Sequence, residues 1–135
     1  MNKNQEIIEQ AYSSNMENMD KNEVSKAIEE TITSLNSGEL RVAEYIDNNW
    51  KVNQWVKKAI LVSFKLRENK ITDTGYTKFY DKLTSKFNNI EEEYLKKNNI
   101  RIVPQAIARE GTYVGKNVVL MPSFMNIGAY VDDGS

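Results

Sequence analysis

Apolar residues recur at three- and four-residue spacing in the first part of the chain, and this pattern predicts helices there. The clearest apolar stripe consists of Val24, Ala27, Ile28, Ile32 and Leu35. Asp20 precedes this stripe as a typical N-cap, and Gly38 follows it as a typical helix stop. The same spacing predicts two further helices over residues 4–13 and 53–67, and an acidic start followed by a basic end predicts a short helix over 91–97.

Shorter extended patterns separate these helices. Residues 40–46 and 50–52 predict two strands of a hairpin, because Asp47-Asn48-Asn49 between them is a turn signal. Residues 71–81 predict a loop and extended chain that turns at Gly75. Residues 100–103 predict a strand stopped by Pro104, a residue that lacks the backbone donor.

The last part of the chain differs in composition. Four of the six glycines and both prolines lie beyond residue 103. We therefore predict a domain boundary there, with a mostly helical domain over residues 1–103 and a second domain over 104–135. The predicted fold class is α+β.

A six-residue rhythm runs through the second domain. One set of positions comprises Ala108, Val114 and Leu120, and a second set four residues later comprises Thr112, Val118 and Phe124. This rhythm predicts the first coils of a left-handed parallel β-helix, in which three hexads close one triangular turn. Leu120 and Met125 are five apart, so either the register shifts near Pro122 or the phase Tyr113–Val119–Met125–Val131 is the correct one. Ordinary hairpins are the alternative.

Composition excludes several kinds of chemistry. The chain has no cysteine and no histidine, which rules out Ser–His and Cys–His catalysis and His-ligated zinc for these residues. A net charge of −1 gives no general attraction to nucleic acid or an anionic membrane, so neither is expected as a partner. The polar N-terminus has no signal-peptide core, and the longest aliphatic run is short, so a cytoplasmic location is expected.

Two blocks of sequence carry a family resemblance. SGELRVAEYIDNNWKVNQWVKKAILVSFKLREN (37–69) resembles the N-terminal domain of the tetrahydrodipicolinate N-succinyltransferases. RIVPQAIAREGTYVGKNVVLMPSFMNIGAYVDDGS (101–135) resembles the first hexapeptide coils of the same family, and its MPS and NIGAYVD runs are the specific part. The resemblance implies the N-terminal half of such an enzyme.

The resemblance also implies an activity. Members move a succinyl group from succinyl-CoA to the amino group of the ring-opened dicarboxylate derived from tetrahydrodipicolinate, on the route to diaminopimelate and lysine. The implied enzyme is a cytoplasmic homotrimer with active sites between subunits and no tightly bound cofactor. The succinyl-CoA site is expected to lie mostly beyond Ser135, so we expect this chain alone to be inactive.

One substrate-binding residue follows from the resemblance. The arginine of the family's R-[VI]-V-P motif binds the dicarboxylate, and it corresponds to Arg101. A guanidinium suits this role because it can donate two parallel hydrogen bonds to a carboxylate. No catalytic residue, cofactor ligand or metal ligand is assigned, and the family's second acidic residue is expected just after Ser135.

Other polar and aromatic residues are given structural interpretations. Asp132 and Asp133 could form an acid–base pair, but we interpret them as a solvated coil corner. Four residues could line the substrate cleft, but for Met121 and Phe124 we favour core packing; the four are Met121, Ser123, Phe124 and Asn126. Core or hairpin packing is expected for Trp50 and Trp55, and a solvated helix edge for Lys57 and Lys58.

Two alternative functions remain open. The chain could be a non-catalytic, shortened assembly or interaction module that uses an exposed coil edge. It could also belong to another hexapeptide-repeat acyltransferase or nucleotidyltransferase. We expect residues 125–135 to be frayed or rearranged unless a neighbouring chain covers them, because the last coil has no further coil to stack on.

Overall fold

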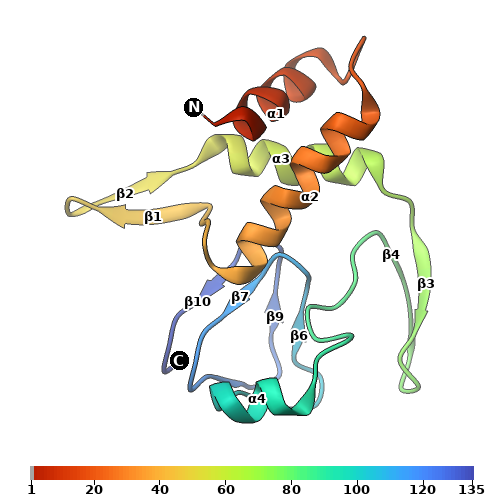
Figure 1. Ribbon diagram of the computed structural model, residues 1–135. Helices are drawn as coiled ribbons and strands as arrows, with labels where there is room; N and C mark the ends of the chain where they lie inside the picture. The colour runs from red at the N-terminus through yellow and green to blue at the C-terminus, as the bar shows by residue number, and fades with distance from the viewer. Residues whose placement is uncertain (1) are drawn as a thin grey trace.

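Three helices form the first part of the structure, a computed structural model that describes residues 2–135 (Figure 1). They are α1 (Lys3–Ser14), α2 (Lys21–Ser37) and α3 (Gln54–Leu66), and each packs against the other two. Their shared core contains Ile8, Val24, Ala27, Ile28, Ala59 and Val62. We call these three helices the helical unit. It confirms the predicted helical N-terminus.

The ends of α2 are fixed by the residues that the sequence indicated. The Asp20 carboxylate accepts a hydrogen bond of 2.9 Å from the Asn22 N–H, which satisfies one of the free donors of the first turn. Gly38 ends the helix with φ at +83°, a left-handed conformation that strains residues with a Cβ. Both end signals are therefore confirmed.

Two antiparallel hairpins flank α3. The first joins β1 (Ala43–Ile46) to β2 (Asn49–Val52) through Asp47 and Asn48, both with positive φ, as two-residue hairpin turns require. It projects away from the helical unit in Figure 1. The second joins β3 (Lys70–Asp73) to β4 (Lys78–Asp81), where the sequence had indicated a loop with extended chain. Gly75 lies in its turn, as predicted.

The first predicted strand starts later than expected. Residues 40–42 are not in β1, because the Leu40 N–H donates to the Ser34 carbonyl and extends the end of α2. The Val42 and Arg41 carbonyls instead accept hydrogen bonds of 2.8 Å from the backbone and side chain of Asn53.

Six two-residue strands follow the short helix α4 (Glu92–Asn98). They are β5 (Arg101–Ile102), β6 (Ile107–Ala108), β7 (Tyr113–Val114), β8 (Val119–Leu120), β9 (Phe124–Met125) and β10 (Tyr130–Val131). They form three parallel pairs, β5 with β8, β6 with β9 and β7 with β10. We call these six strands and their turns the strand stack.

The register of the strand stack shifts by one residue near Pro122, one of the two possibilities that the sequence left open. Arg101 pairs with Val119, 18 residues later, whereas Ile107 pairs with Phe124, 17 residues later. Because one residue is missing, the inward position that pairs with Ala108 falls on Met125 instead of residue 126, and Phe124 pairs with Ile107 at an outward position. Phe124 is 61% exposed and Met125 only 8%, so the predicted inward position of Phe124 is wrong.

Aliphatic side chains fill the interior of the strand stack. Ala108, Val114, Val118, Leu120 and Met125 are buried there, and Ile100 and Leu95 pack against them from the side of α4. Residues 125–135 are not frayed, which corrects that expectation. Strand β10, which lies in this segment, pairs with β7, and the Gly134 N–H donates to the Lys116 carbonyl at 2.9 Å.

The helical unit rests on one end of the strand stack. Ile127 of the strand stack belongs to the helical core, and Gly128 lies where an added Cβ would be 2.9 Å from the Val42 side chain. The boundary at residue 103 stays a prediction; β5 on one side of it pairs with β8 on the other. Within residues 2–135, none of the helices combines the length and the apolar character needed to cross a membrane.

Candidate functional site

Arg101, the predicted substrate-binding residue, lies on an exposed and firmly held strand. Its N–H donates to the Val118 carbonyl at 3.0 Å, and the Val103 N–H donates to the Leu120 carbonyl at 2.9 Å. The residue is exposed, and its guanidinium makes no hydrogen bond or ion pair with any of residues 2–135. The side chain is therefore free to bind an anion, and its backbone is fixed on both sides.

The residues around the MPS turn lie on the outside of the strand stack. Met121 is 58% exposed and Phe124 61%, so the core packing that we favoured for both is wrong. The Ser123 hydroxyl donates to the Met121 carbonyl at 2.6 Å and holds the turn closed. Asn126 is engaged in structure, since its Oδ1 accepts from the Arg109 guanidinium at 2.8 Å and from the Ile127 N–H at 2.9 Å.

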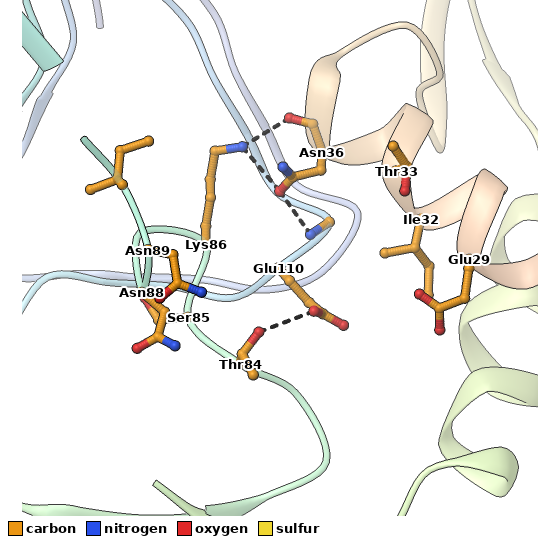
Figure 2. A pocket seen from close by; sticks show the side chains of 12 residues that line it. Glu29, Ile32, Thr33, Asn36, Thr84, Ser85, Lys86, Asn88, Asn89 and Glu110 are labelled. Carbon is orange, nitrogen blue, oxygen red and sulfur yellow. Dashed lines mark hydrogen bonds between the residues drawn. The ribbon is translucent and has the colours of Figure 1, made fainter. Parts of the chain in front are cut away.

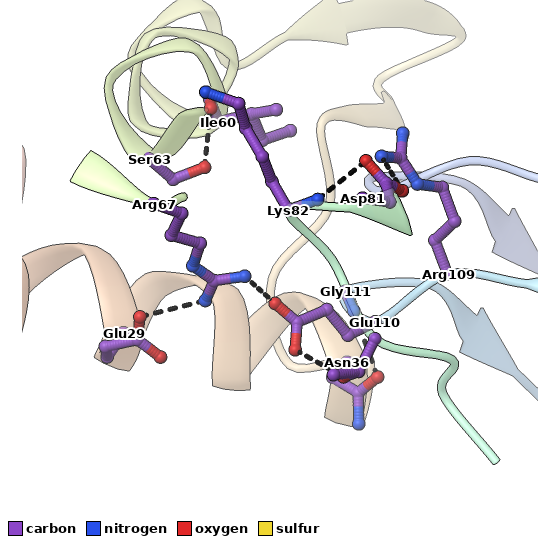
Figure 3. Close-up of polar contacts among 11 residues, drawn as sticks. Glu29, Asn36, Ile60, Ser63, Arg67, Asp81, Lys82, Arg109, Glu110 and Gly111 are labelled. Atoms are coloured by element: carbon purple, nitrogen blue, oxygen red, sulfur yellow. Dashed lines mark hydrogen bonds and ion pairs between the residues drawn. The ribbon is translucent and has the colours of Figure 1, made fainter. Parts of the chain in front are cut away.

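An apolar groove of about 400 Å³ adjoins this turn. It lies between the β3–β4 hairpin and strands β6 and β9, with Phe79, Ile107 and Phe124 among its lining residues. Arg109 closes part of it and donates to the Asp81 carboxylate at 2.8 Å (Figure 3). Partial burial raises the pKa of Asp81, but the Lys82 N–H and the Arg109 guanidinium together lower it more, so it lies below its ordinary value.

A second set of charges joins the helical unit to the strand stack. Arg67, just after α3, donates to Glu29 of α2 at 2.8 Å and pairs with Glu110 of the strand stack (Figure 3). The other Glu110 oxygen accepts from the Thr84 hydroxyl at 3.1 Å. One guanidinium thus holds two carboxylates from separate parts of the chain.

A polar cavity of about 320 Å³ lies beside this junction (Figure 2). It is bounded by α2, by residues 84–90 and by Glu110 and Gly111. Lys86 donates to the Asn36 carbonyl at 2.8 Å and to the Asn36 side-chain oxygen at 3.0 Å. Burial lowers the pKa of Lys86 to about 8, because these acceptors are uncharged.

The remaining predicted residues have structural positions. Asp132 and Asp133 are exposed at a turn, as expected, and the Asp133 carboxylate accepts from the Lys116 N–H at 2.8 Å. Trp50 packs against Tyr45 in the hairpin with its ring tilted by 57°, but it is 65% exposed. Lys58 pairs with Glu9. Among residues 2–135, His, Cys, Asp and Glu form no cluster of three that could hold a metal ion.

Sequence reasoning missed the polar residues that the fold brings together. Arg67, Arg109 and Lys86 were not singled out, because none lies on an apolar stripe and the family resemblance gave none of them a role. The one available signal was the charged pair Arg109-Glu110, which stands between two positions of the apolar six-residue rhythm. Two adjacent charges between apolar inward positions indicate a corner of the coil that contacts other polar residues.

Comparisons with known proteins identify the class of protein. Residues 3–66, which contain the helical unit, match the family model described as "Tetrahydrodipicolinate N-succinyltransferase N-terminal". The 2,3,4,5-tetrahydropyridine-2,6-dicarboxylate N-succinyltransferase of Acinetobacter baylyi is 52% identical over 113 residues, which are 84% of this chain and 41% of that protein. The protein of the same name from Burkholderia multivorans is 50% identical over 133 residues, 96% of this chain and 48% of that one.

The chain belongs to the tetrahydrodipicolinate N-succinyltransferase family. It spans about half the length of the curated relatives it matches. The family resemblance predicted from the two sequence blocks is confirmed.

Proposed function

We propose that the chain is the N-terminal part of an enzyme that succinylates ring-opened tetrahydrodipicolinate in diaminopimelate and lysine biosynthesis. The observation that carries this proposal is 50% identity over 96% of the chain to a relative named for this reaction. The match runs through the helical unit and the strand stack alike, so it does not rest on a widespread repeat alone.

The proposed reaction is an acyl transfer from a thioester to an amine. The substrate amine attacks the carbonyl carbon of succinyl-CoA and forms an amide, while the carbon–sulfur bond breaks and CoA leaves as the thiol with the proton lost by the amine. We assign Arg101 to one carboxylate of the acceptor. Its unpaired guanidinium and its rigid strand support this role, because the planar guanidinium offers two parallel donors to a carboxylate and the strand holds the backbone in place.

We also propose that the strand stack begins a left-handed parallel β-helix. Three parallel strand pairs and burial at Ala108, Val114 and Leu120 support this fold, since a hexapeptide coil buries every sixth residue. The proposed enzyme is a cytoplasmic homotrimer with succinyl-CoA as its co-substrate. The outward apolar side chains Val119, Met121 and Phe124 support an assembly, because a neighbouring copy would cover them.

A chimera tests the proposed activity. The chain replaces the matching segment of the Acinetobacter baylyi relative, and CoA release is followed with a thiol reagent in the presence and absence of tetrahydrodipicolinate. We expect substrate-dependent release by the chimera and none by the chain alone. Release that does not need tetrahydrodipicolinate would contradict the proposed acceptor.

Arg101 is tested in the same chimera. Arg101→Lys keeps the charge but loses the paired donors, and we expect it to raise KM for tetrahydrodipicolinate about tenfold or more, which corresponds to about 1.4 kcal/mol. KM for succinyl-CoA should stay unchanged. Lys57→Gln, on the exposed edge of α3, is the control. An equal rise in both KM values would contradict a carboxylate-binding role.

A further inference from the structure

The cavity beside Lys86 carries charges of both signs around a partly apolar wall. The Lys86 amino group and Asn36 lie at one end, and the Glu29 and Glu110 carboxylates lie toward the other (Figure 2). Ile32 and Ile90 contribute the apolar part of the lining. Arg67 neutralises one of the two carboxylate charges. The cavity and this guanidinium together are therefore close to neutral.

Lys86 lacks a counter-ion in this cavity. An ammonium group has three donors, and two of them are used by the oxygens of Asn36. Within residues 2–135, Lys86 forms no ion pair with a carboxylate. A partly desolvated cation with only neutral acceptors is unfavourable, and this is the cause of its lowered pKa. An incoming carboxylate would relieve this cost.

The opposite end of the cavity favours a cation. Glu29 uses one carboxylate oxygen for Arg67, and its other oxygen has no partner among residues 2–135. The side-chain amides of Asn88 and Asn89 also line the cavity and make no side-chain hydrogen bond within the described chain. An anion alone would be repelled by the glutamates, and a cation alone would be repelled by Lys86.

We propose that this cavity binds a small zwitterionic aminocarboxylate, with its carboxylate on Lys86, its ammonium on Glu29 and its aliphatic spacer against Ile32 and Ile90. The volume of about 320 Å³ is at the small end of the range for ligand pockets, which suits a molecule of this size. The site is separate from Arg101 and does not depend on the proposed acyl transfer.

Three probes of equal chain length test the proposal: 5-aminopentanoate, pentanoate and pentylamine. Each is titrated into the isotopically labelled chain, and the amide signals of Asn88, Asn89 and Gly111 are followed by NMR. We expect 5-aminopentanoate to bind about fivefold more tightly than either probe with one charge, which corresponds to the loss of one partly exposed ion pair of about 1 kcal/mol. Equal binding of the three probes, or shifts confined to other residues, would overturn the proposal.

Matched variants assign the two ends. Lys86→Gln should lower the affinity for 5-aminopentanoate to that of pentylamine for the unmodified chain. Glu29→Gln should lower it to that of pentanoate. Lys57→Gln, at an exposed position outside the cavity, should change nothing. If Lys86→Gln unfolds the chain, the three-probe comparison on the unmodified chain still decides. Unchanged affinity in both folded variants would refute the assignment.

Discussion

Replacing Gly38 by alanine should destabilise the protein by more than the backbone conformation alone explains. Gly38 has φ at +83°, and the left-handed conformation costs a residue with a Cβ about 1–2 kcal/mol. An added Cβ would also lie 2.6, 2.8 and 2.9 Å from three ring carbons of Tyr113, well inside a normal contact. This contact joins the end of α2 to β7 of the strand stack.

The Tyr113 ring cannot move away without cost. The centroid of the Tyr113 ring lies 4.5 Å from the centroid of the Tyr130 ring. The Arg41 guanidinium in turn lies 3.8 Å from the centroid of the Tyr130 ring. Overpacking of such a site costs about 1–3 kcal/mol. The free energy of unfolding should therefore fall by about 2–5 kcal/mol in Gly38→Ala, the sum of the conformational and packing costs.

Urea unfolding at constant temperature, followed by circular dichroism, measures this loss. Gly75→Ala and Gly134→Ala are matched controls, because both glycines have similar φ values of +77° and +79° and no atom within 4 Å of an added Cβ. In these two controls the free energy of unfolding should fall only by the conformational cost of about 1–2 kcal/mol. Adding Tyr113→Ala to Gly38→Ala should remove the packing part, so the two changes should not be additive. A loss in Gly38→Ala equal to that of the controls would refute the reasoning.

Three further predictions concern the cap, the buried lysine and the register. Asp20→Ala should lower the free energy of unfolding by about 1 kcal/mol and Asp20→Asn by much less, in the same urea experiment, because asparagine also caps. The pKa of Lys86 is about 8 in the folded chain and ordinarily 10.5, so between these values the folded chain binds fewer protons than the unfolded chain. Stability should therefore rise with pH across that window, and Lys86→Met should lessen the rise; an unchanged pH profile would contradict it. Leu120→Ala should cost about 2–5 kcal/mol and Phe124→Ala less than about 0.5 kcal/mol, because the first is 4% exposed and the second 61%; equal losses would contradict the shifted register.

The register shift shows why part of the strand stack could not be predicted. The six-residue rhythm identified Ala108, Val114 and Leu120 correctly as inward positions. It failed at Phe124, because the sequence allowed two phases after Pro122 and both contain apolar residues. Only the pairing of Ile107 with Phe124 and of Ala108 with Met125 decides between them. This pairing joins segments far apart in the chain.

The polar junctions were beyond prediction for a related reason. Arg67 meets Glu29 and Glu110, which are 38 and 43 residues away, and Lys86 meets Asn36, which is 50 residues away. No spacing rule links residues so far apart. Their types are also common on any protein surface, so only the packed fold distinguishes them from solvated charges.

The sequence by itself determined the local structure and the family. Helix stripes, the Asp20 and Gly38 ends and the Asp47-Asn48 turn depend on interactions within a few residues, and the family depends on residue identity alone. The tertiary structure decided the register of the strand stack and the cavity beside Lys86. Both depend on which distant segments share space, because burial and the loss of water around a charge arise only when those segments pack together.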